Sequence, residues 1–156
     1  AAVCPHGPDA GPLPSDTPAR IAAYAARLRD PERAQAAADA WCQWETSIFG
    51  GDIHAPGSRY GDPLFRLGFA RIVTHFFTHN GWFSDDQLLR QAARMAHIPC
   101  TMIHSRFDPS CPLRGPWELA QGWPAAALQI LGGTTHSALD ADMRAAIRAA
   151  TDALPI

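Results

Sequence analysis

Two short apolar runs with a helical segment between them constrain the fold of this chain more than any other feature. The runs cover residues 99–104 and 127–131, and each is too short for a helix of ordinary length. Residues 112–123 between them begin with a proline and show a helical pattern, and a last helix is predicted over 139–153. Because strands joined by a helix usually pair in parallel, the sequence predicts a β-α-β-α segment over 96–156.

The preceding region shows helical periodicity instead. Signals that begin helices recur along it, either as a capping residue followed by proline or as a capping box. They are found at Asp16, Asp30, Pro63 and Ser84. Residues 1–16 contain four prolines and are expected to form an extended lead-in. The predicted fold class is therefore a helix-rich α/β protein, with a lead-in (1–16), a helical region (17–95) and the β-α-β-α segment (96–156).

Composition excludes several classes of function. Of the 156 residues 47% are hydrophobic, as in globular proteins, and the formal net charge of −2 argues against a nucleic-acid partner. No apolar run reaches the roughly 18 residues that a membrane span needs. The four cysteines form no C-x-x-C pair and show no zinc-ligand spacing. We therefore expect reduced thiols, a cytoplasmic location, no metal and no cofactor.

Two residues follow the predicted strands, where functional side chains of α/β proteins gather. Asp108 lies shortly after the first strand and His136 shortly after the second. Because neighbouring parallel strands end at the same sheet edge, an Asp108–His136 hydrogen bond is expected. A carboxylate on one ring nitrogen fixes the tautomer, and the other nitrogen can then act as a base. The alternative is that Asp108 caps a turn and His136 caps the last helix.

A series of unlike residues in fixed order extends over residues 97–152. It includes His97-Ile98-Pro99, Arg106-Phe107-Asp108, Cys111-Pro112, Trp123-Pro124, Ala127-Leu128-Gln129-Ile130 and His136-Ser137-Ala138. In this order and spacing the stretch resembles the carboxyl-terminal third of the proline iminopeptidase family, serine peptidases of the α/β-hydrolase fold. The resemblance implies that Asp108 and His136 are the aspartate and histidine of a Ser–His–Asp triad.

The resemblance extends more weakly into the helical region. Residues 40–45 (AWCQWE) resemble the helical cap of the same family, whose glutamates bind the free amino group of the substrate. The resemblance implies that Glu45 binds substrate and that Trp41 and Trp44 line the pocket. Where the family usually has a second glutamate this chain has Val73, which is a departure from the pattern. The alternative for Glu45 is a surface position with its carboxylate in water.

The nucleophile motif of that family, G-x-S-x-G, does not occur in these 156 residues. The nearest stretch, residues 57–61, has the wrong spacing. Without a nucleophile covalent acyl transfer is lost, but acid–base chemistry by a His–Asp pair is not. The sequence therefore predicts a truncated α/β-hydrolase, in which a helical cap is joined to the carboxyl-terminal β-α-β-α segment.

Three functions are compatible with this pattern. The one we favour is a repurposed biosynthetic enzyme acting on a small molecule, in which His136 is the general base and Asp108 orients it. The second is the Asp/His-bearing chain of a split serine hydrolase or aminopeptidase, and the third is a non-catalytic binding or structural remnant. Two strands cut from a larger sheet leave open edges, so we expect a homo-oligomer or a partner subunit. Neither nucleic acid nor a membrane is an expected partner.

Overall fold

The computed structural model describes residues 16–48 and 51–154 of the chain. The chain divides into two compact units, Ala1–Ser84 and Asp85–Ile156. Most of the predicted lead-in lies outside the described residues. None of the described helices is both long and apolar enough to cross a bilayer.

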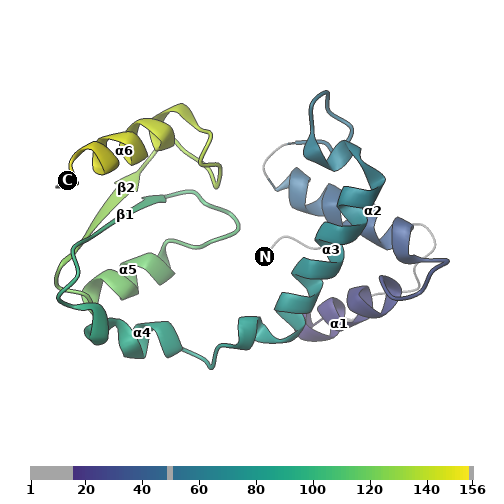
Figure 1. Cartoon of the computed structure of the whole chain (residues 1–156), viewed down its shortest axis with the longest axis horizontal. Helices are drawn as coiled ribbons and strands as arrows, with labels where there is room; N and C mark the ends of the chain where they lie inside the picture. The colour runs from purple at the N-terminus through teal and green to yellow at the C-terminus, as the bar shows by residue number, and fades with distance from the viewer. Residues whose placement is uncertain (1–15, 49–50, 155–156) are drawn as a thin grey trace. The chain divides into compact units, whose positions relative to one another are not determined.

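The described part of the first unit is helical. Its elements are α1 (Thr17–Arg27), α2 (Ala34–Ser47), η1 (Arg59–Gly61), α3 (Pro63–Thr78) and η2 (Asn80–Trp82), where η marks a 3₁₀ helix. Helix α3 packs against both α1 and α2, as Figure 1 shows. The unit therefore has the helical character that the sequence predicted for this region.

The residue at which each helix begins depends on which backbone N–H group the capping side chain binds. Helix α1 begins as predicted, because the Asp16 carboxylate accepts the backbone N–H of Ala19 at 3.2 Å. Helix α2 begins later than predicted. Asp30 uses its carboxylate to accept the N–H of Glu32 at 3.0 Å within a turn, and the helix starts only at Ala34. Asp30 is therefore a turn residue and not the N-cap of α2.

Small side chains allow the helices of this unit to pack closely. Ala38 and Ala70 are fully buried, so the α2 and α3 backbones approach without bulky groups between them. Trp41 fills the remaining space and meets the Tyr24 ring edge-on at 5.3 Å between centroids. The buried cluster consists of Tyr24, Leu28, Ala37, Ala38, Trp41, Cys42, Ile53 and Ala70.

The second unit contains a parallel two-stranded sheet. Its strands are β1 (Cys100–Ser105) and β2 (Ala126–Leu131), with α5 (Arg114–Gln121) between them and α6 (Ala141–Asp152) after them. The register runs from Cys100 opposite Ala126 to Ser105 opposite Leu131. Helix α5 packs on β2 and α6 on β1, and they lie on opposite sides of the strands (Figure 1). The predicted β-α-β-α order is confirmed.

Residues 85–95 belong to this second unit, whereas the sequence placed them in the helical region. The predicted capping box at Ser84 does not begin a helix here. Helix α4 (Gln87–Gln91) starts later, with Asp86 at its N-cap in a left-handed conformation, and η3 (Ala92–Met95) follows it. The single helix predicted through residue 95 is thus two short segments.

Candidate active site

Asp108 lies on the loop that follows β1, in a turn that holds its carboxylate in place. Its Oδ1 accepts the backbone N–H groups of Ser110 at 2.9 Å and of Cys111 at 2.8 Å. Aspartate favours such turns because its short side chain reaches the backbone two residues ahead, and Pro109 restricts the chain in between. One carboxylate oxygen is anchored by the turn, and Oδ2 can meet a different partner.

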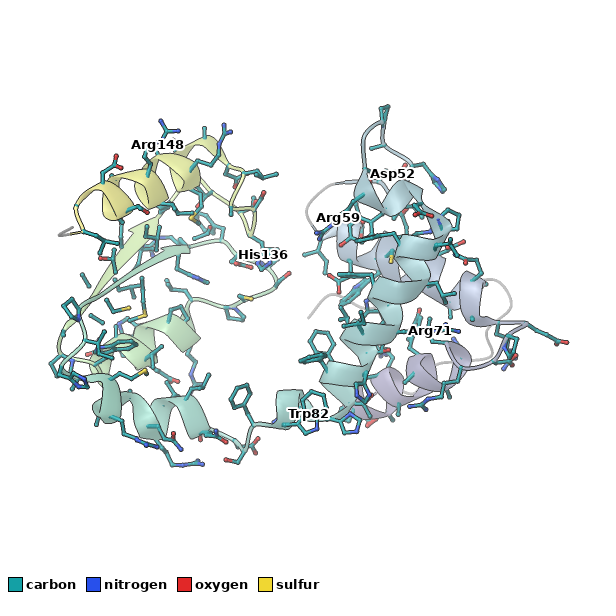
Figure 2. All side chains as sticks on the ribbon, in the orientation of Figure 1. Asp52, Arg59, Arg71, Trp82, His136 and Arg148 are labelled. Carbon is teal, nitrogen blue, oxygen red and sulfur yellow. The ribbon has the colours of Figure 1, made fainter. Side chains whose placement is uncertain are left out.

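That partner is His136, on the loop that follows β2 (Figure 2). Its Nδ1 donates a hydrogen bond of 2.9 Å to Asp108 Oδ2. The His136 side chain is 42% exposed, whereas that of Asp108 is 6% exposed. The parallel pairing of β1 and β2 brings both loops to one sheet edge, as the sequence predicted. With Nδ1–H bound to the carboxylate, Nε2 carries the basic lone pair of the ring.

The hydrogen bonds around Asp108 keep its carboxyl group ionised. Partial burial by itself would raise the pKa of Asp108. The N–H of Cys111, the ring of His136 and the N–H of Ser110 outweigh that effect, and the pKa lies below its ordinary value. At neutral pH Asp108 is therefore a carboxylate that can stabilise a protonated imidazole. One carboxylate oxygen of Asp108 closes a turn, and the other binds His136. The turn-capping role and the hydrogen bond to His136, which the sequence offered as alternatives, are therefore both found at Asp108.

Hydrogen bonds that the sequence did not indicate support the two loops. The Ser105 hydroxyl, buried at the end of β1, donates to the backbone carbonyl of Thr134 and accepts the N–H of Phe107 at 3.2 Å. Asp140 accepts the N–H of Thr135 at 2.7 Å and its hydroxyl at 3.0 Å. These contacts tie the loop that carries the histidine to β1 and to the start of α6. A serine ending a strand and an aspartate before a helix are too common to be singled out from sequence.

Cys111 lies on the same turn as Asp108, and its surroundings favour the protonated thiol. Partial burial and the negative charge of Asp108 both raise the pKa of the Cys111 thiol. A protonated thiol is a poor nucleophile. The environment of Cys111 therefore disfavours it as a substitute for a catalytic serine.

The predicted substrate-binding residues lie together on α2 in the first unit. The Trp41 indole N–H donates to Glu45 Oε1 at 3.2 Å, and the rings of Trp41 and Trp44 meet edge-on at 5.3 Å. Trp41 is a core residue with 3% exposure, whereas Trp44 and Glu45 are half-buried. The buried Trp44 indole N–H has no acceptor among the described residues. Buried polar groups without a hydrogen-bond partner are rare in native proteins.

A cavity of about 240 Å³ lies elsewhere in the same unit, between α1 and α3. It is lined by Ala25, Leu28, Arg29, Arg71, Thr74 and His75. None of the predicted substrate-binding residues lines this cavity. The arginines gave no signal in the sequence, because arginine is the chain's only strongly basic residue type and is found along its whole length.

No protein-family model matches the sequence. It is 42% identical over 137 residues to a proline iminopeptidase of Xylella fastidiosa (strain Temecula1 / ATCC 700964), a match that covers 85% of this chain and 44% of that protein. A proline iminopeptidase of Xanthomonas citri is 41% identical over 137 residues, with the same coverage. One from Arabidopsis thaliana is 37% identical over 123 residues, which cover 76% of this chain and 32% of that protein.

The chain thus spans less than half the length of these curated relatives. Each match nevertheless covers at least 76% of this chain, and all three relatives are proline iminopeptidases. The parallel strand pair between helices is consistent with part of an α/β-hydrolase. Over the matched residues the chain belongs to the proline iminopeptidase family, as a partial proline iminopeptidase-like α/β-hydrolase.

Proposed function

We propose that Asp108 and His136 form the acid–base pair of an aminopeptidase-type hydrolase. The observation that carries the proposal is the 2.9 Å hydrogen bond from His136 Nδ1 to Asp108 Oδ2 at the carboxyl ends of two parallel strands. The relationship to proline iminopeptidases, which are hydrolases, supports the same chemistry.

Each member of the pair has a separate role in this mechanism. His136 takes a proton from a nucleophile through Nε2 and later delivers it to the leaving amine. Asp108 holds the ring in the tautomer with hydrogen on Nδ1 and stabilises the imidazolium that forms. Its own position is kept by the backbone N–H groups of Ser110 and Cys111.

The nucleophile in this proposal comes from a polypeptide segment other than these 156 residues, which contain no G-x-S-x-G motif. The names of the relatives suggest substrates with an amino-terminal proline. Glu45 is the proposed partner of the substrate's ammonium group. A carboxylate attracts such a group strongly when both are partly removed from water.

A hybrid protein tests the proposal. This chain replaces the matching 137-residue segment of the Xanthomonas citri relative, which then supplies the remaining part of the molecule. We expect the hybrid to release naphthylamine from proline 2-naphthylamide. A hybrid that unfolds cooperatively near the melting temperature of its parent, yet leaves the substrate intact, would contradict the proposed function.

The repurposed small-molecule enzyme is the second candidate. It is favoured because the pair and its supporting hydrogen bonds all lie within residues 105–140 of one unit, so acid–base chemistry needs no group from elsewhere. A metabolite screen with the 156-residue chain and its His136→Ala variant separates the candidates. Turnover by the unmodified chain alone would select the repurposed enzyme.

Glu45→Gln in the hybrid is expected to raise KM for proline 2-naphthylamide by about 10–100-fold and to change kcat little. The reason is that a hydrogen bond to a charged group contributes about 1.5–3 kcal/mol, and this contact is made before and during the reaction. Glutamine keeps the oxygen that accepts from Trp41. Steady-state kinetics with Gln43→Glu as a matched control checks this, and an unchanged KM would remove Glu45 from the binding site.

The 156-residue chain by itself is proposed to associate with a second copy or with a partner subunit. Within residues 16–48 and 51–154 the sheet has two strands whose outer edges are unpaired, and several large apolar side chains of the second unit are exposed. These include Phe107, Trp117, Leu139 and Leu154. Light scattering coupled to size exclusion should give a dimer or larger species, and a monodisperse monomer at micromolar concentration would refute this proposal.

A further inference from the structure

Three side chains at the end of the sheet form a cluster with the chemistry of a metal site. Asp108, Cys111 and His136 each present a ligand atom, and these atoms all lie within 4.8 Å of one another. Asp108 and Cys111 come from one loop, and His136 comes from the next. The sequence predicted no metal, because the ligands lie on two loops and share no compact motif.

The geometry points to a binding site for a divalent transition metal, with Zn²⁺ as the best-suited ion. Thiolate, imidazole and carboxylate together are the ligand set that zinc takes in proteins, and zinc displaces the proton of the Cys111 thiol into solvent when it binds. Calcium and magnesium prefer oxygen ligands, so a site with sulfur and nitrogen selects against them. Three protein ligands leave one tetrahedral position for water.

The three ligand atoms lie within 4.8 Å of one another, and the distance between two of them is close to the one that zinc requires. Ligand atoms bound tetrahedrally at about 2.0–2.3 Å from zinc lie roughly 3.3–3.6 Å from each other. Asp108 Oδ2 and His136 Nδ1 are 2.9 Å apart, so they need to separate by only about 0.4 Å. Cys111 has an exposed side chain that can rotate toward the other two. No rearrangement of the strands is needed.

Hydrogen bonds position the backbone of the ligands in advance. Asp108 Oδ1 accepts two backbone N–H groups of its own turn, which leaves Oδ2 to bind the ion. His104 on β1 donates from Nε2 to the carbonyl of Cys111 at 2.8 Å and so fixes the residue that carries the thiol. Ligands ordered in this way lose less entropy when they bind.

Zinc at this position would also affect the proposed function, and this consequence rests on that proposal. An ion bound to Asp108 Oδ2 and the ring of His136 takes the place of the proton that they share. The ring proton of His136 then resides on Nε2, which can no longer accept a proton from a nucleophile. Zinc would therefore be a reversible inhibitor of the hybrid hydrolase.

The test is a titration of the chelator-treated 156-residue chain with zinc chloride by calorimetry, repeated with cobalt chloride and followed by absorption. The unmodified chain should bind one ion and show a thiolate-to-cobalt charge-transfer band. Cys111→Ser should lose this band and bind zinc about 100-fold more weakly, as expected for loss of a direct ligand. The matched control is Cys100→Ser, on β1 of the same unit, which should keep both properties.

The inference would be overturned if the Cys111→Ser variant bound zinc as tightly as the unmodified chain. It would also be overturned if the unmodified chain showed no charge-transfer band with cobalt. Circular dichroism of each variant shows that it is folded. Zinc binding with an inactive hybrid would contradict only the proposed function. If the 156-residue chain binds no zinc and the hybrid is active and not inhibited by zinc, only the metal site would be contradicted.

Discussion

His136→Ala is expected to lower the rate of proline 2-naphthylamide hydrolysis by the hybrid about 10²–10⁴-fold, the range that general acid–base groups supply. Alanine removes the imidazole that moves the proton but no packed apolar group, because His136 is an exposed loop residue. The melting temperature should therefore change little. Hydrolysis rates and thermal unfolding of the same preparations check both expectations.

The matched control is His97→Ala, which removes another exposed histidine of the same unit. It should leave the rate within about twofold of the unmodified hybrid, as surface changes away from a site do. Equal rates for the His136→Ala and His97→Ala hybrids would show that His136 is not the base.

Asp108→Asn should lower the hydrolysis rate of the hybrid by up to about 10⁴-fold while the loop keeps its conformation. The carbonyl oxygen of the introduced amide can still accept the N–H groups of Ser110 and Cys111, which Oδ1 of the aspartate accepts now. The amide nitrogen then faces His136 Nδ1 in place of Oδ2 and donates to it. This stabilises the tautomer with hydrogen on Nε2, which cannot accept a proton from a nucleophile.

The pH dependence gives a second signature of this change. Because the pKa of Asp108 lies below its ordinary value, the carboxylate is ionised throughout the neutral range and its support of the imidazolium persists there. The lower hydrolysis rate of the Asp108→Asn hybrid should therefore be seen throughout the neutral pH range and not only at acid pH. Asp152→Asn, at the end of α6, is the matched control. A rate loss of less than tenfold would mean that Asp108 serves the turn alone.

The parallel strand pair and the contact between Asp108 and His136 could be predicted from the sequence for one physical reason. Short apolar runs separated by a helix leave few topologies, and parallel neighbours bring the loops after their carboxyl ends to the same edge. The juxtaposition of residues 28 positions apart follows from that topology. No knowledge of the surrounding side chains was needed.

Other features depend on contacts that sequence patterns do not specify. Asp30 has the identity of an N-cap, but its carboxylate bonds within a turn, and Ser84 precedes a helix that begins only at Gln87. The support that Ser105 and Asp140 give to the loops depends on which backbone groups the fold brings near them. Ligands that converge from two loops, such as Cys111 and His136, are likewise invisible until the loops are placed.

The most direct measurement of whether the Asp108–His136 pair activates a nucleophile is the rate of fluorophosphonate labelling, because it needs no knowledge of the natural substrate. The hybrid should be labelled stoichiometrically at the serine that its relative supplies, and His136→Ala should slow labelling by about 10²-fold or more. The 156-residue chain alone should not be labelled, because it has no nucleophile motif. Equal labelling rates for the hybrid and its His136→Ala variant, or labelling of a serine in the chain alone, would contradict the proposed role of the pair.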